Sequence, residues 1–206
     1  MTGARPVATP PITWAVAGRA HPGEQQSGDL HVVAPYAGGV LVAVIDGLGH
    51  GPEAAAAARL AAAVLENRPT DSPLDLVREC HRQLHGSRGA VMSLAAIDDS
   101  GAMTWIGTGN VEGVLVRATS QASDRMALPL RGGIVGVGVL RPAASTEQLL
   151  RNDILVLSTD GIRGEFISAV DASRAPHALA DAIVARFARD ADDALVLAAR
   201  FEGTRR

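Results

Sequence analysis

The stretch that decides the fold is VLVAVIDGLGHGPE, residues 40–53. It begins with six aliphatic residues in a row, a pattern typical of a strand buried on both faces. Asp46 ends this run, glycine occupies three of the next five positions, and Pro52 opens an alanine-dense segment. Proline at a first helical position and alanine throughout favour a helix. The stretch therefore predicts a buried strand with a carboxylate at its end, then a tight turn and a helix.

Carboxylates stand beside apolar runs at three further places. Asp160 follows one such run and precedes a glycine, while Asp192 and Asp193 come just before the last run. Asp29 comes directly before the run that begins at residue 30. Each of these alone is commonly a turn or capping residue. If the fold brings them together with Asp46, they supply the hard oxygen ligands that Mg²⁺ and Mn²⁺ require.

The glycine-rich turn after Asp46 has a second interpretation, a loop that cradles a phosphate at a helix N-terminus. The spacing argues against it, because the Gly-x-Gly-x-x-Gly pattern needs glycine where Pro52 stands. Asp46 would also repel a phosphate unless a cation lay between them. A metal site is therefore favoured over a phosphate loop, and a plain turn with a solvated aspartate stays open.

The order of the remaining elements predicts the fold class. Strands precede two helices, many strands follow, and one helix and one strand close the chain, without regular βαβ alternation. We expect an α+β fold with about ten strands and three helices, a four-layer αββα sandwich of two antiparallel β-sheets flanked by helices. A loose arm is expected at residues 1–11 and a single domain at 12–206. The expected strands are 12–17, 30–36, 40–45, 90–97, 102–108, 111–118, 153–158 and 194–201; the expected helices are 52–66, 72–85 with Ser72 as N-cap, and 175–189; 121–131 is expected as a loop.

Composition excludes several classes of function. The 206 residues are 47% hydrophobic and 20% charged, which suits one globular domain. All 19 basic residues are arginine, so no lysine nucleophile or P-loop lysine exists. The net charge of −3 argues against a nucleic-acid partner. The single cysteine, Cys80, excludes an intrachain disulfide and is expected to be a buried thiol. Without a long apolar run or a leader pattern, no membrane partner is expected and the protein is predicted to be cytoplasmic.

Three motifs, in chain order, resemble those of the metal-dependent PPM (protein phosphatase 2C-like) serine/threonine phosphatases: Asp46-Gly47-Leu48-Gly49-His50-Gly51, Ser158-Thr159-Asp160-Gly161 and Asp192-Asp193. Two tripeptides resemble those of the bacterial branch that includes the sporulation stage II phosphatase: Ser27-Gly28-Asp29 and Gly49-His50-Gly51. The length is similar to that of the RsbX-type members, which act on stressosome proteins. The resemblance spans about residues 12–201.

This resemblance implies a centre of two Mn²⁺ or Mg²⁺ ions. Asp46 would bridge the ions, and the Gly47 carbonyl would help to hold one of them. Asp160 and Asp192 would complete the coordination shell of one ion, and Asp29 would lie by the other ion. Of the neighbouring pair Asp192 and Asp193, Asp193 is the weaker candidate. A water activated between the ions would attack phosphorus directly, which agrees with the general chemistry of paired metals.

Three positions depart from the family pattern. Leu48 stands where many eukaryotic members have a histidine that serves as general acid; His50, two residues later, could replace it or could cap the helix. Gln25 stands where those members have a phosphate-binding arginine. Leu195 replaces the serine or threonine that is common after the last acidic motif.

The resemblance implies a phosphatase that acts on serine or threonine of a regulatory protein, with a phosphorylated STAS-domain stress-response protein as substrate. Two other functions stay open: a catalytically weak module that binds a phosphoprotein, and a metal-dependent hydrolase of small phosphate esters.

Three further features have weaker interpretations. His81 and His85 are spaced as a helical metal pair but are expected to be surface histidines. Arg163 could contact a phosphorylated partner or form a structural ion pair, and the glycine-rich residues 132–140 could form a flap near the site.

Overall fold

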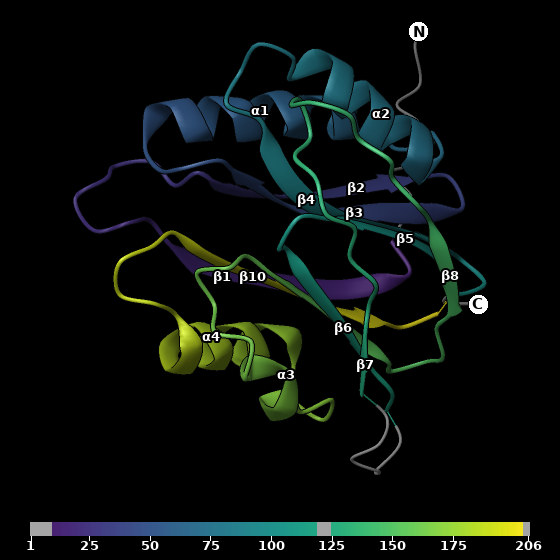
Figure 1. The fold of residues 1–206 in the computed structure, drawn as a ribbon. Coiled ribbons are helices and arrows are strands. Elements are labelled where there is room, and N and C mark those ends of the chain that lie inside the picture. Colours follow the sequence, from purple (N-terminus) through teal and green to yellow (C-terminus); the bar gives the residue numbers. More distant parts are fainter. Residues whose placement is uncertain (1–9, 119–124, 204–206) are drawn as a thin grey trace, which may run out of the picture.

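The computed structural model describes residues 10–118 and 125–203. In this part of the chain, ten strands and four helices form four layers (Figure 1). The strands are β1 (Ile12–Arg19), β2 (Asp29–Tyr36), β3 (Gly39–Gly47), β4 (Ala90–Asp98), β5 (Ala102–Thr108), β6 (Glu112–Val116), β7 (Arg125–Ala127), β8 (Ser145–Gln148), β9 (Ile154–Ser158) and β10 (Ala194–Phe201); the helices are α1 (Pro52–Asn67), α2 (Pro73–Gln83), α3 (Phe166–Ala169) and α4 (Pro176–Phe187).

Two antiparallel sheets lie face to face between the helices. One has the strand order β1-β10-β9-β6-β7 and the other the order β2-β3-β4-β5-β8. Helices α1 and α2 cover the second sheet, while α3 and α4 cover the first (Figure 1). The α+β fold and the αββα sandwich predicted from the element order are thus confirmed.

Strand β3 explains why residues 40–45 are apolar at every position. Its residues at 40, 42 and 44 belong to the core between the two sheets, and those at 41, 43 and 45 pack beneath α1 and α2. A strand covered on both faces has no solvent side, so the sequence cannot alternate. A third core lies under α3 and α4.

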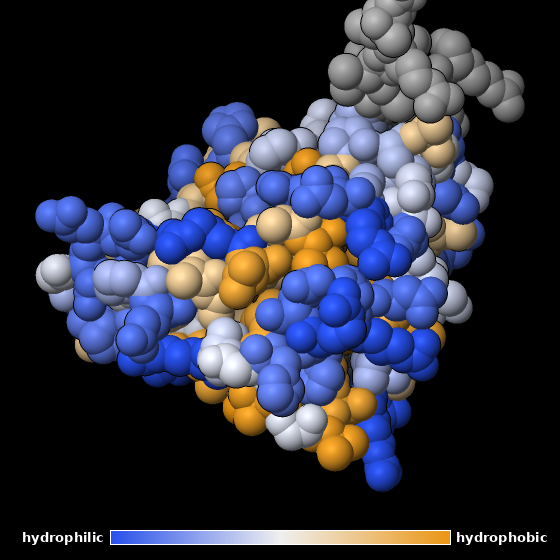
Figure 2. Space-filling view, turned by 90° about the horizontal axis from the view of Figure 1, so that it is seen from above, coloured by the Kyte–Doolittle hydropathy of each residue, from blue (hydrophilic) through white to orange (hydrophobic). Residues whose placement is uncertain are grey.

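The helical layer over β3 is built from small and well-capped segments. Seven residues of α1 are buried, and all but Leu65 are alanine, which lets the helix lie close to the sheet. Ser72 caps α2 as predicted, because its hydroxyl accepts the Asp75 N–H at 3.2 Å. Figure 2 looks onto this layer, where hydrophobic surface shows between hydrophilic side chains. Leu60 of α1 is 47% exposed.

Several element predictions need correction. The expected loop 121–131 contains β7, which pairs with β6, while residues 121–124 lie outside the described part. Strand β8 and helix α3 were not predicted: β8 is polar and covers only an edge of β5, and α3 is a four-residue turn too short for helical periodicity. The strand expected at 111–118 covers only 112–116.

At the chain ends, residues 1–9 of the expected arm lie outside the described part, and the Pro11 carbonyl accepts the Glu202 N–H at 2.8 Å. No helix within residues 10–118 and 125–203 is long and apolar enough to cross a membrane.

Candidate metal centre and active-site pocket

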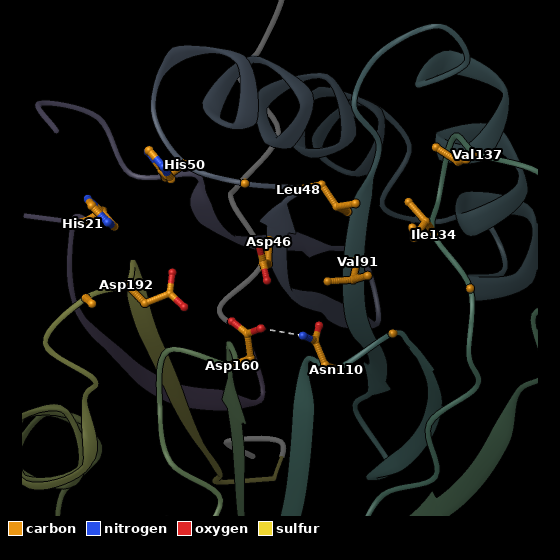
Figure 3. Close-up of a pocket in the computed structure, with 14 residues that line it drawn as sticks. His21, Asp46, Leu48, His50, Val91, Asn110, Ile134, Val137, Asp160 and Asp192 are labelled. Carbon is orange, nitrogen blue, oxygen red and sulfur yellow. Dashed lines mark hydrogen bonds between the residues drawn. The ribbon is translucent and has the colours of Figure 1, made fainter.

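Carboxylates from both sheets meet at one end of the sandwich. Asp46 lies near the end of β3, Asp160 lies two residues beyond β9, and Asp192 lies two residues before β10. All three line one pocket of about 660 Å³ (Figure 3). His50, the proposed general acid, lines the same pocket. The convergence that the sequence pattern required is therefore present in the fold.

The glycine after each of two aspartates permits close packing of the backbone at this end. A Cβ atom on Gly47 would lie 2.1 Å from the Ala54 carbonyl oxygen in the first turn of α1. A Cβ atom on Gly161 would lie 1.7 Å from the Asp193 carbonyl oxygen. Real Cβ atoms do not approach backbone so closely, so only glycine lets the two loops seat their carboxylates here. The repeated Asp-Gly pair thus has a packing cause.

Asp46 is a largely buried carboxylate whose charge is opposed by its surroundings. Burial, followed by repulsion from Asp29 and the other aspartates of the centre, raises its pKa from 3.8 to about 8. Its carboxylate makes no hydrogen bond or ion pair to any other residue in the described ranges. Nothing there offsets the effect of burial and of the neighbouring negative charges on its pKa. A bound cation would remove this penalty directly.

Asp29 is held behind the pocket by a buried network. It is the register partner of Asp46 in the β2–β3 pair, is only 4% exposed, and does not line the pocket. The Thr159 hydroxyl donates to its Oδ2 at 2.7 Å and accepts the Leu195 N–H at 2.9 Å. Burial raises the pKa of Asp29 to about 7 although this hydrogen bond opposes the rise. Nothing in the sequence pattern indicated this role of Thr159 beyond its place in the Ser158-Thr159-Asp160-Gly161 motif.

Asp160 is exposed at the pocket and is oriented by a residue that the sequence analysis did not select. The Asn110 side-chain amide donates to Asp160 Oδ2 at 2.6 Å. Loss of water around the carboxylate raises the pKa of Asp160, and repulsion from Asp192 adds to it, while Arg189 and the Asn110 hydrogen bond oppose the rise. Asn110 follows Gly109 in a turn between strands, so its sequence context indicated only a hairpin.

The neighbouring aspartates 192 and 193 occupy different environments. Asp192 lines the pocket. Asp193 is buried, and its two carboxylate oxygens accept the backbone N–H groups of His21 at 2.7 Å and Gly28 at 2.9 Å. Asp193 therefore fixes the β1–β2 connection to the start of β10, while Asp192 faces the pocket.

His50 belongs to a small group at the rim of the pocket. It does not cap α1, whose N-cap is Gly51 without a side-chain hydrogen bond, so the capping interpretation is wrong. Its Nδ1 lies 2.9 Å from Glu24 Oε1, and because a carboxylate only accepts, Nδ1 carries the hydrogen. The His21 ring stacks on His50 with centroids 4.5 Å apart. Neither Glu24 nor His21 was selected from the sequence.

The other residues singled out in the sequence lie as follows. Leu48 lines the pocket, whereas Gln25 is exposed and does not. Arg163 forms no ion pair within the described ranges; its guanidinium donates to the Arg186 carbonyl at 2.6 Å. His85 is exposed, but His81 is half-buried, so the surface interpretation fails for His81. Cys80 is buried as expected, and burial raises the pKa of its thiol to about 12.

The donor set fits a hydrated divalent cation. Among residues 10–118 and 125–203, no group of three or more His, Cys, Asp or Glu side chains forms a cage that could hold a metal ion. Mg²⁺, however, usually keeps several waters and binds proteins through one or two carboxylates. The unpartnered Asp46 carboxylate, with Asp160 and Asp192 in the same pocket, matches that preference for oxygen ligands.

Comparison with known proteins identifies the family. Residues 36–202 match the family model of stage II sporulation protein E (SpoIIE). The chain belongs to the SpoIIE family. Its predicted place among the bacterial PPM phosphatases of the RsbX and SpoIIE branch is thereby confirmed. No curated protein matches the chain.

Solved structures of the same architecture extend this finding. A structure described under "The bacterial stressosome" is 28% identical, with a TM-score of 0.83, and the match covers 92% of this chain and 99% of that one. RsbX in complex with magnesium is 18% identical, with a TM-score of 0.81 and coverage of 93% and 96%. The Mycobacterium tuberculosis serine/threonine phosphatase PstP/Ppp is 14% identical, with a TM-score of 0.72 and coverage of 93% and 99%. The last two likenesses are likenesses of fold.

Proposed function

We propose that this chain is a metal-dependent protein serine/threonine phosphatase that dephosphorylates a regulatory phosphoprotein, a STAS-domain component of a stress-response module. The observation that carries the proposal is the convergence of Asp46, Asp160 and Asp192, from both sheets, in one pocket. The SpoIIE family match and the likenesses to a stressosome structure and to magnesium-bound RsbX support it.

Asp46, Asp160 and Asp192 would hold Mn²⁺ or Mg²⁺, with the Gly47 carbonyl and Asp29 beside them. Such ions supply a lowered pKa for the attacking water and neutralise charge on the phosphoryl oxygens. Asn110 fixes the direction of the Asp160 carboxylate through its 2.6 Å hydrogen bond. Thr159 fixes that of Asp29 in the same way. These two bonds position the carboxylates before substrate arrives, which reduces the reorganisation needed during the reaction.

His50 is the group proposed to protonate the leaving serine or threonine oxygen. Glu24 engages its Nδ1, so Nε2 is the nitrogen left for the substrate. Stacking on His21 restricts the orientation of the ring. The chain contains no lysine, and its one cysteine is buried, so direct attack by water agrees with the residues present.

Hydrolysis of three substrates, compared side by side in the presence of Mn²⁺, tests the proposal. They are a folded STAS-domain protein phosphorylated on serine, a phosphopeptide of the same local sequence, and p-nitrophenyl phosphate. We expect the highest kcat/KM for the folded protein, because contacts remote from the phosphate can orient it at the centre. Equal kcat/KM for peptide and folded protein would remove the support for a folded partner. Turnover of the ester alone would favour a small-molecule hydrolase, and no turnover would favour a binding module.

A further inference from the structure

The pocket has two chemically different halves. In Figure 3 the carboxylates of Asp46, Asp160 and Asp192 lie on one side, and four aliphatic side chains lie on the other. We call this second side the aliphatic wall; it consists of Leu48, Val91, Ile134 and Val137. Carboxylates suit the binding of metal ions and water. The aliphatic side chains of the wall can bind neither, so a different part of a substrate must lie against them.

Two residues of the aliphatic wall come from the glycine-rich segment 132–140, which is anchored rather than loose. Val135 is fully buried and exchanges two backbone hydrogen bonds with Ala90, at 2.8 and 3.0 Å. Ile134 and Val137, on either side of this anchor, form a backbone bridge with each other. The segment therefore holds Ile134 and Val137 at fixed positions beside the pocket.

Gly136 completes this turn. Its φ is +98°, a conformation that side chains rarely adopt, and a Cβ atom here would lie 2.6 Å from Leu84 Cβ in the connection after α2. Its N–H donates to His81 Nδ1 at 2.9 Å. This contact explains why His81 is half-buried, and it ties the segment to α2.

Val137 is the exposed member of the wall, whereas Val91 is only 7% exposed and Leu48 and Ile134 are partly buried against the core between the sheets. Val137 is 46% exposed although it borders the pocket, while most large aliphatic residues of the described part are buried. A rigidly held aliphatic surface that faces a pocket gains free energy when an apolar group covers it. The covering group must also be continuous with whatever occupies the acidic half.

We propose that the aliphatic wall is a specificity site for an aliphatic side chain next to the phosphorylated serine or threonine of the substrate. The inference rests on the proposed function, which places the phosphoryl group in the acidic half of the same pocket. The residue adjoining the phosphorylated one is then the part of the substrate nearest to the wall. Val137 and Ile134 select it by contact, and they take no part in the chemical step.

Two phosphoserine peptides test this proposal, one with leucine on both sides of the phosphoserine and one with serine on both sides. With Mn²⁺ present, we expect the wild-type protein to favour the leucine-flanked peptide by about fivefold or more in kcat/KM. Val137→Ser should bring the ratio close to one, and Val137→Ile should preserve it. The matched control is Val139→Ser, since Val139 is 85% exposed in the same segment but does not line the pocket.

The outcomes separate this inference from the proposed function. Equal hydrolysis of both peptides by the wild-type protein, or a preference that Val137→Ser leaves intact, would overturn the role of the wall and leave the phosphatase in place. Absence of metal-dependent hydrolysis of either peptide would overturn the proposed function and the wall's role with it. A melting temperature of Val137→Ser equal to that of Val139→Ser shows that any altered preference does not come from unfolding.

Discussion

Replacement of Asp46 by asparagine should make the metal-free protein more stable. In the folded protein the pKa of Asp46 is about 8, against 3.8 for an unperturbed aspartate. At pH 7 the folded state therefore keeps a proton that the unfolded chain has released. At about 1.36 kcal/mol per pH unit, this difference destabilises the folded state by at most about 4 kcal/mol.

The net gain for Asp46→Asn is smaller, because the amide must also be stripped of water at this position. An unsatisfied polar group of this kind costs about 1–3 kcal/mol. We therefore expect a gain of about 2 kcal/mol, which is a rise in melting temperature of about 4–8 °C for a chain of this size. Activity should be lost in the same variant, so stability and function should move in opposite directions.

Thermal and urea unfolding in EDTA at pH 7 measure this difference. The matched control is Asp190→Asn, whose side chain is fully exposed in the loop before β10 and whose effect should lie within about 0.5 kcal/mol of zero. Saturating Mn²⁺ should reverse the order, since the wild-type protein gains binding energy that the variant lacks. A lower melting temperature for Asp46→Asn in EDTA would refute the argument from buried, unpaired charge.

Three further predictions concern the same centre. The metal-free protein should lose stability as the pH rises from about 4 to about 8. Asp29 and Asp46 have folded pKa values of about 7 and 8, so the folded protein binds protons more tightly than the unfolded chain does. Urea unfolding in EDTA across this pH range measures the loss, and a free energy of unfolding that stays constant would contradict it. Added Mn²⁺ should raise the melting temperature of the wild-type protein, and less so that of Asp160→Asn; an identical response in both would remove Asp160 from the site. Thr159→Val should cost about 1–3 kcal/mol in urea unfolding, because the Asp29 carboxylate and the Leu195 N–H both lose their hydroxyl partner. Thr159→Ser keeps the hydroxyl and should retain most of the stability, and a larger loss in Thr159→Ser than in Thr159→Val would contradict the hydrogen-bond argument.

The parts of the fold that were predictable are those where burial dictates the sequence. The continuous aliphatic run of β3 and the alanine face of α1 follow from their position between layers, so their patterns can be read directly. Strand β8 carries no such pattern because it is polar and packs at an edge. Helix α3 is a single short turn and therefore shows no periodicity.

The site divides in a similar way. Carboxylates at strand ends were visible in the sequence because a charged residue beside a long apolar run is conspicuous. Asn110, Glu24 and His21 were not, since each lies in a turn or connection where polar residues are common. Their contacts depend on how loops distant in the sequence meet, as between Asn110 and Asp160. The difference between Asp192 and Asp193 is likewise decided by tertiary hydrogen bonds.

The central claim is that this pocket hydrolyses phosphoserine with metal ions held by Asp46. Its most direct test is phosphate release from a serine-phosphorylated STAS-domain protein by metal-stripped protein, with Mn²⁺ added in steps. We predict no release without metal, saturable release with it, and a loss of about a thousandfold or more in Asp46→Asn, equivalent to about 4 kcal/mol of transition-state stabilisation. Release that persists in EDTA, or an Asp46→Asn variant within about tenfold of the wild-type rate, would contradict the claim.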